Sequence, residues 1–204
     1  MAKDKYQITT KAQYINLLLL KDELQHFDGV LSDVLIDINA WLTKLRATRG
    51  VFLTLNNVMD AVKRIQINGD GDFVTKTRKL KKSLIFSNHF RNRGIGHLND
   101  TLLKRAVQWS PQLFYESSKD NEAFQLVEAQ RTIIESCINS FIDKDGVQKI
   151  FGTEIDLMYP PDAKQFFTYL SETVNNAISW LSEAASILLS RSGFVTPTET
   201  FGCA

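Results

Sequence analysis

The spacing of apolar residues restricts most of this chain to helices. Between residues 14 and 25, and again between residues 51 and 65, apolar side chains recur at intervals of three and four. That period places them on one face of an α-helix, whereas a half-buried strand alternates at every second residue. The nearest approach to an alternating pattern is the short terminal string GFVTPTETF. The sequence therefore predicts an all-α fold, an antiparallel bundle of about five to six helices.

Several short segments divide the helical pattern into elements. Glycine and proline weaken or end helices, so they mark the expected boundaries. These boundaries are the Asp28–Gly29 pair, Gly50 as a candidate interruption, the NGDGD string at 68–72, and Trp109–Ser110–Pro111. The segment between the last two is expected to run as one helix, and the final helix is expected to extend from Asp162 to Arg191. We therefore predict a single helical domain over residues 1–191 and a flexible tail over residues 192–204.

The composition is that of a globular protein, with 44% hydrophobic and 23% charged residues. The chain holds no apolar run near the ~18 residues that a membrane-spanning helix needs. Its first residues, MAKDKYQITTK, lack the apolar centre of a secretory signal. We therefore expect a cytoplasmic protein without a membrane partner. The two cysteines, Cys137 and Cys203, are far apart and give no support for a disulfide framework or a zinc site.

The positive charge is concentrated in one window of the sequence. The net charge of the chain is only +1, but residues 76–105 contain nine Lys or Arg and one acid, Asp100, for a net charge of +8. The remaining 15 basic and 22 acidic residues, from totals of 24 and 23, carry −7. A basic region on an otherwise acidic protein favours a polyanionic partner, whereas the plainer interpretation is a solvated, Lys-rich helix face.

Within that window, the string FSNHFRNRGIGHLND at 86–100 combines polar chemistry with two helix-weakening glycines. Histidine moves protons near neutral pH, and arginine offers phosphate oxygens a permanently charged fork. Arginine, histidine and asparagine together, without carboxylates or thiols, suit a metal-independent attack of a ribose 2′-hydroxyl on its neighbouring phosphate. The plainer interpretation makes Arg91 and Arg93 solvated helix residues and His97 a packing residue.

Regular helical geometry keeps the two central groups of this string apart. At ~100° per residue, His89, Arg93 and His97 share one face of a helix. Arg91 and His97 differ by about 240° and do not meet on a regular helix. A site that uses Arg91 with His97 therefore needs either a helix break at the two glycines or a second copy of the chain.

Other kinds of site find less support. The chain has no GK[ST] phosphate loop, and neither DKDGVQ nor NGDGDF fits the ligand spacing of a calcium loop. His89 and His97 have no carboxylate partner between them, which disfavours a metal site. We expect neither a metal nor another cofactor. A small-molecule sensor with Trp41, Trp109 and Trp180 around a pocket is a further hypothesis, although core packing is the plainer role of these rings.

The string FRNRGIGHL resembles the signature of the HEPN superfamily. In that signature an arginine, often followed by asparagine, precedes a histidine by four to six intervening residues. Here Arg91 and Asn92 precede His97, with five residues between Arg91 and His97. Relatives commonly carry alanine at the position of Gly96. The resemblance is sharp over this short string, and elsewhere it rests on the helical character of the chain.

The resemblance implies an all-helical, metal-independent endoribonuclease that leaves a 2′,3′-cyclic phosphate and a 5′-hydroxyl. By this resemblance, His97 serves as general base or acid, Arg91 binds the scissile phosphate, and Asn92 positions one of them. Many members act as toxins or abortive-infection factors in bacterial defence, typically as homodimers. The implied partners are RNA, a second copy of the chain and an antitoxin protein. The side chains expected to contact RNA are Arg78, Lys79, Lys81, Lys82, His89 and Arg93.

A hypothesis from a different class is also open. The superfamily includes non-catalytic members, so the chain is alternatively a helical dimerisation module that binds nucleic acid or a partner protein. Cleavage of RNA in the presence of EDTA distinguishes the two.

Overall fold

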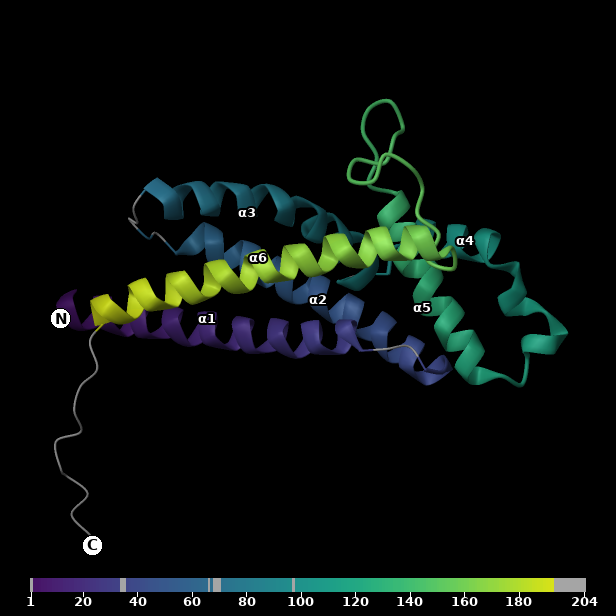
Figure 1. Cartoon of the computed structure of the whole chain (residues 1–204), viewed down its shortest axis with the longest axis horizontal. Helices are drawn as coiled ribbons and strands as arrows, with labels where there is room; N and C mark the ends of the chain where they lie inside the picture. Colours follow the sequence, from purple (N-terminus) through teal and green to yellow (C-terminus); the bar gives the residue numbers. More distant parts are fainter. Residues whose placement is uncertain (1, 34–35, 66, 68–70, 97, 193–204) are drawn as a thin grey trace, which may run out of the picture.

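The protein is folded almost entirely into α-helices (Figure 1). The computed structural model describes residues 2–33, 36–65, 67, 71–96 and 98–192, and these residues contain six α-helices and no strand. The prediction of an all-α bundle is therefore confirmed. No helix in the described ranges has the length and apolar character needed to cross a membrane. The α-helices are α1 (Ala2–Ser32), α2 (Ile38–Arg64), α3 (Gly71–Phe90), α4 (Asp100–Trp109), α5 (Glu122–Asn139) and α6 (Pro160–Ser192).

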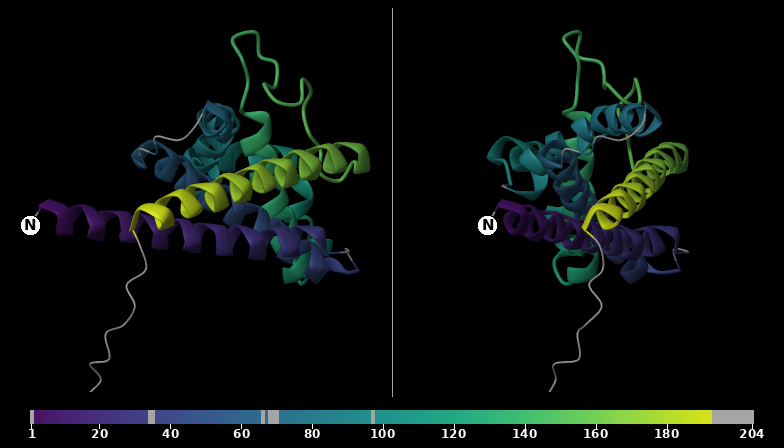
Figure 2. Two further views of the ribbon diagram at one scale, coloured as in Figure 1. Left: turned by 60° about the vertical axis from the view of Figure 1, so that its left-hand side comes forward. Right: turned by 90° about the vertical axis from the view of Figure 1, so that its left-hand side faces the viewer.

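The four long helices α1, α2, α3 and α6 run antiparallel to their neighbours (Figure 1). α1 packs against α2 and along much of α6, and α3 packs against α2 and α6. α5 packs against α2 and α4, at the opposite end of the molecule from the start of α1. Figure 2 shows from two further sides that the connection between α5 and α6 projects from the helical body. The helical body therefore carries α3, and the polar motif that begins at Arg91, on a surface that α1 does not cover.

The core is built from apolar side chains of all six helices. Phe52 on α2 stacks on Phe90 at the end of α3, with 3.9 Å between ring centroids, and meets Phe86 edge-on. Phe166 of α6 joins the same aromatic group. Because Arg91 directly follows Phe90, this buried contact fixes the place where the polar motif begins.

Two glycines that the sequence marks as helix boundaries lie inside long helices. α1 continues through Asp28 and Gly29 to Ser32, so the predicted break at this pair is wrong. Gly50 lies inside α2, where an added Cβ would overlap the ring of Phe27 on α1. A glycine weakens a helix by only ~1 kcal/mol. The packing of α1 against α2 and α6 is therefore sufficient to keep both helices continuous.

The other boundaries agree more closely with the structure. α4 ends at Trp109, with Ser110 as its C-cap, as the Trp109–Ser110–Pro111 string predicted. α6 begins at Pro160, close to the expected start at Asp162, because proline is tolerated in the first turn of a helix. Most of the predicted 68–72 loop and nearly all of the predicted tail, from residue 193 onward, lie outside the described residues.

A buried ion cluster on α5 holds the segments that flank it. Arg131 pairs with Glu128 and Glu135 at 2.7 Å each, and its side chain is only 9% exposed. Glu128 accepts a hydrogen bond from Gln112 after α4, and Glu135 accepts one from the backbone N–H of Leu157 before α6. Burial raises the pKa of Glu135. Burial also opposes ionisation of Glu128, but hydrogen bonds from Arg131 and Gln112 hold its pKa below the ordinary value.

Candidate functional site

The polar motif lies at a break between two helices. α3 gives way to a π-helical turn over Arg91–Ile95, in which the N–H of Gly96 donates to the carbonyl oxygen of Arg91 at 2.8 Å. α4 begins only at Asp100, with Asn99 as its N-cap. The expectation of one helix through this region is therefore wrong. Glycine favours such a break because it has little preference for the helical conformation.

The helix is interrupted after Arg91, which is one of the two alternatives that a site using Arg91 with His97 requires. An uninterrupted helix would hold these residues about 240° apart, so that only a break or a second copy of the chain could bring them together. The break at the glycines is present. His97 lies outside the described residues, so the described part of the site consists of Arg91, Asn92 and their surroundings.

Arg91 and Asn92 are both exposed at the start of the π-helical turn. The Nη1 of Arg91 donates to the Oδ1 of Asn92 at 3.1 Å, which is the contact through which Asn92 would position Arg91. A Cβ at Gly96 would lie 3.4 Å from the Nε of Arg91 and 3.1 Å from its carbonyl oxygen. The absence of a side chain at Gly96 therefore lets the arginine stem lie close against the turn.

The turn is anchored to α2 and α5 through Gly94. Gly94 is buried, and an added Cβ would overlap the Sγ of Cys137 on α5. Its carbonyl oxygen accepts a 3.4 Å hydrogen bond from Arg49 on α2, which also donates to Gln130 on α5 at 3.1 Å. Arg49 is a cation beside the motif that sequence reasoning missed, because no motif marks it and it lies 45 residues away along the chain.

Cys137 is a packing residue in this arrangement. Burial raises the pKa of its thiol to about 12, although the positive charges of Arg49 and Arg93 act in the opposite direction. A thiol with so high a pKa holds its proton at neutral pH, and the thiolate is the nucleophilic form. We therefore assign no chemical step to Cys137.

His89 is packed into the contact between α3 and α5. Its Nε2 lies 3.2 Å from the carbonyl oxygen of Cys137 and 3.0 Å from the Oγ of Ser140, and its ring packs against Phe141. Burial lowers the pKa of this imidazole, and the nearby charge of Arg93 lowers it further. A half-buried, neutral histidine with internal partners is a weaker candidate for an RNA contact than Arg93, which is exposed.

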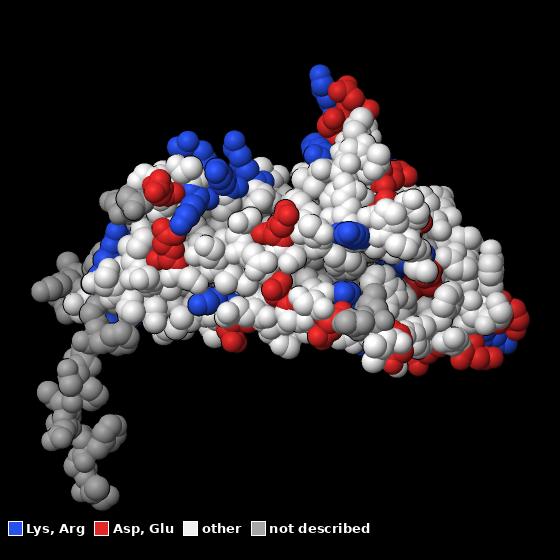
Figure 3. All heavy atoms as spheres, in the orientation of Figure 1, with Lys and Arg blue, Asp and Glu red and all other residues white. Residues whose placement is uncertain are grey.

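α3 carries the predicted RNA-binding cations on its exposed side. Figure 3 shows Lys and Arg side chains gathered over this helix. Within the described part of the chain, four of them are exposed and form no ion pair or hydrogen bond: Arg78, Lys79, Lys81 and Lys82. Lys76 instead pairs with Glu183 on α6 at 2.6 Å. At 1.5 Å per helical residue, Lys81 lies about 15 Å along α3 from Arg91.

The three tryptophans do not surround one pocket. Trp180 is buried against Phe73, and Trp41 packs edge-on against Phe167. Trp109 is 41% exposed and lies beside Arg105.

Among the described residues, which leave out His97, no three His, Cys, Asp or Glu side chains are grouped as a metal site.

Comparisons of the chain with protein-family models, with curated proteins and with solved structures gave no match. The likeness to the HEPN superfamily therefore rests on the Arg91, Asn92 and His97 spacing and on the helical fold.

Proposed function

We propose that this protein is a metal-independent endoribonuclease of the HEPN type, acting in the cytoplasm in bacterial defence or in a toxin–antitoxin system. One observation carries the proposal. The exposed guanidinium of Arg91 donates a hydrogen bond to Asn92 where α3 gives way to the π-helical turn, six residues before His97 in the sequence. A phosphate-binding group therefore lies at the start of this turn, and the proton-transferring residue of the motif follows the turn in the sequence.

The proposed chemistry is a transesterification within the RNA strand. The 2′-oxygen forms a bond to the adjacent phosphorus, and the bond from phosphorus to the 5′-oxygen breaks. His97 takes the proton of the 2′-hydroxyl or supplies one to the leaving 5′-oxygen. Arg91 binds the non-bridging oxygens, whose negative charge grows in the transition state. The products are a 2′,3′-cyclic phosphate and a 5′-hydroxyl.

Binding of the RNA strand is assigned to the cations of α3. Arg78, Lys79, Lys81 and Lys82 are exposed and have no partner among the described residues, so no internal ion pair has to break when they meet phosphates. Arg93, exposed on the turn itself, extends this basic surface to the motif. Such contacts release counterions and weaken steeply with added salt.

A homodimer is part of the proposal. Exposed apolar side chains follow the motif directly: Leu98 is 53% exposed, and Leu103 and Val107 of α4 are 37% and 51% exposed. Leu103 and Val107 are four residues apart and therefore share one face of the helix. An apolar face next to the motif suits a contact that brings two copies of Arg91 toward each other.

The test is cleavage of labelled RNA by the purified protein in excess EDTA. We expect cleavage with cyclic-phosphate products, and a loss of about 100-fold or more in both Arg91→Ala and His97→Ala. The matched controls are Arg64→Ala and His26→Ala. Both residues are exposed and lie outside the motif, so these variants should keep nearly full activity.

Two outcomes contradict the proposal or replace it. Cleavage that is equal in wild type and variants assigns the activity to a contaminant. Cleavage of no RNA class removes the enzyme, and if RNA is still bound the non-catalytic dimerisation module takes its place. A toxin role further requires that expression of the wild type, but not of His97→Ala, arrests growth.

A further inference from the structure

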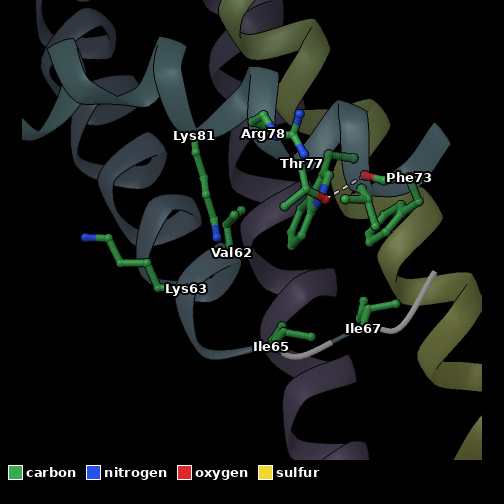
Figure 4. Close-up of a pocket in the computed structure, with 10 residues that line it drawn as sticks. Val62, Lys63, Ile65, Ile67, Phe73, Thr77, Arg78 and Lys81 are labelled. Atoms are coloured by element: carbon green, nitrogen blue, oxygen red, sulfur yellow. Dashed lines mark hydrogen bonds between the residues drawn. The ribbon is translucent and has the colours of Figure 1, made fainter. Parts of the chain in front are cut away.

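A pocket of about 530 Å³ opens between the end of α2 and the first turns of α3 (Figure 4). Small-molecule sites in proteins typically measure about 300–1,000 Å³, so the pocket is large enough for a ligand. It is remote from Arg91, because its α3 residues lie between Phe73 and Lys81. It therefore belongs neither to the cleavage motif nor to the apolar face of α4.

The rim of the pocket is cationic. Lys63 of α2 and Arg78 and Lys81 of α3 line it, and no carboxylate is among the described lining residues. Figure 4 shows Lys81 extending from α3 toward Val62 of α2. Lys63 lies 3.8 Å from Asp60, whereas Arg78 and Lys81 have no partner among the described residues. Two uncompensated cations three residues apart on one helix provide a site for an anion.

The floor of the pocket is apolar and fixed in position. It is formed by Ile65, Ile67, Phe73 and Trp180, and Phe73 and Trp180 are both nearly fully buried. The indole N–H of Trp180 donates to Thr77 at 2.9 Å, and the Thr77 hydroxyl donates to the carbonyl oxygen of Phe73 at 2.7 Å. These groups are paired with each other, so the floor offers no free hydrogen-bonding group. The apolar surface that is open to a ligand comes from Ile67 and from Val74 on the pocket wall.

The cations of the pocket are continuous with the proposed RNA-binding surface. Arg78 and Lys81 belong to the same exposed basic segment as Lys79 and Lys82. A strand that follows α3 from Arg91 reaches Lys81 after about 15 Å. An RNA strand bound at the motif therefore needs to extend only about 15 Å along α3 to place another of its nucleotides at this pocket.

We propose that the pocket binds one nucleotide, with its phosphate at Arg78 and Lys81 and its base against the apolar floor. The combination selects this class of ligand, because an inorganic anion leaves the floor uncovered and an uncharged apolar molecule leaves the two cations unused. The inference rests on the proposed function, and it assigns the pocket to a nucleotide away from the scissile bond. A free mononucleotide carries the same chemistry, and the experiment separates the two sources.

Trp180 supplies a direct signal for occupancy of the pocket. In the double variant Trp41→Phe/Trp109→Phe it is the only tryptophan, since the chain contains three. Titration with AMP, CMP, GMP and UMP should change its emission in a saturable way, and inorganic phosphate should bind about tenfold more weakly than the best nucleotide. Calorimetry on the wild type with the same probes gives a second measurement that does not depend on the tryptophan substitutions.

Two variants of equal charge separate pocket binding from general attraction to a basic surface. Val74 lines the pocket and is 44% exposed, whereas Gln165 of α6 is exposed and does not line it. Val74→Glu places a carboxylate one helical turn before Arg78, where it can pair with that cation, and should weaken nucleotide binding about tenfold. Gln165→Glu changes the net charge equally but should weaken binding by no more than about twofold.

Oligonucleotides with 2′-O-methyl groups identify the source of the nucleotide, because they lack the attacking hydroxyl. Tighter binding of the oligonucleotide than of any mononucleotide assigns the pocket to the RNA strand, and the reverse order assigns it to a free nucleotide. No saturable signal with any probe, equal loss in both Glu variants, or equal binding of phosphate and nucleotides would overturn the inference. Nucleotide binding without RNA cleavage would reject the proposed function alone, and cleavage without nucleotide binding would reject the pocket alone.

Discussion

Gly94 lies on the buried side of the π-helical turn, with no room for a methyl group between its Cα and the Sγ of Cys137. The close approach lets the turn lie directly on α5, and Arg49 of α2 donates a hydrogen bond to the carbonyl oxygen of Gly94. Arg91 and Asn92 are therefore presented from a backbone that is fixed on its buried side. The motif glycines have different roles, because Gly94 fills a buried contact and Gly96 leaves space for Arg91.

We predict that Gly94→Ala destabilises the fold by ~1–3 kcal/mol, because the new methyl group overpacks the contact with Cys137. In Gly94→Ala/Cys137→Ala the sulfur is absent, so the double variant should be at least ~0.5 kcal/mol more stable than the sum of the single effects implies. Urea denaturation of the four proteins measures this coupling.

The control for that cycle is Gly29→Ala. Gly29 is also within a helix, but a Cβ there meets nothing within 4 Å. Alanine should be neutral or stabilise by up to ~1 kcal/mol at that position. Additive effects of Gly94→Ala and Cys137→Ala would contradict the proposed contact.

At the scale of elements, α5 connects the motif to the irregular segments of the fold. The middle of α5 carries Arg131 between two glutamates, and its last turn carries Cys137 beneath the π-helical turn. The carboxylates of the cluster accept hydrogen bonds from Gln112 and from the backbone of Leu157. The segments on both sides of α5 thus depend on one buried arginine.

We predict that Arg131→Ala destabilises the protein by ~3–5 kcal/mol, because it leaves two buried carboxylates without their counter-charge. The variant Glu128→Gln/Arg131→Met/Glu135→Gln removes all three charges and should regain most of that loss. Thermal and urea unfolding measure both. Arg46→Ala, at an exposed arginine of α2, should change stability by less than ~0.5 kcal/mol. An effect of Arg131→Ala as small as that of Arg46→Ala would show that the cluster contributes little.

At the scale of the whole molecule, charge and apolar surface are distributed unevenly. The window 76–105 carries +8 while the remaining residues carry −7. The basic side chains gather over α3 (Figure 3), and the exposed apolar side chains Leu103 and Val107 lie on α4, just beyond the motif. The proposed contacts with an anionic strand and with a second copy of the chain would therefore use different helices, α3 before the motif and α4 after it.

We predict that the wild type is a dimer in light scattering and that Leu103→Glu/Val107→Glu is a monomer with RNA cleavage reduced at least about tenfold. Charged side chains on the apolar face of α4 would have to be desolvated in the interface, at a cost that a small contact does not offset. The control is Ile15→Glu/Leu19→Glu, on an exposed apolar part of α1. A monomer in the control and a dimer in the α4 variant would place the interface on α1.

Much of the helical framework follows from residues that are close together in the chain. The apolar period of three and four, the proline after Trp109 and the two prolines at the start of α6 act within one or two turns. They predicted the all-α bundle, the end of α4 and the approximate start of α6. The exposed cations of α3 and the contact between Arg91 and Asn92 could also be expected from the sequence, because these residues are neighbours in the chain and need no distant partner.

Only the tertiary structure decided which glycines interrupt a helix. The chain continues through Gly29 and Gly50 but departs from the α-helix at the turn that contains Gly94. The difference of ~1 kcal/mol between glycine and alanine is small compared with the packing free energy of a long helix, so distant contacts determine the outcome. For the same reason the packing of His89, the buried charge of Arg131 and the nucleotide-sized pocket beside α3 could not be inferred from the sequence, because each depends on side chains brought together from different helices.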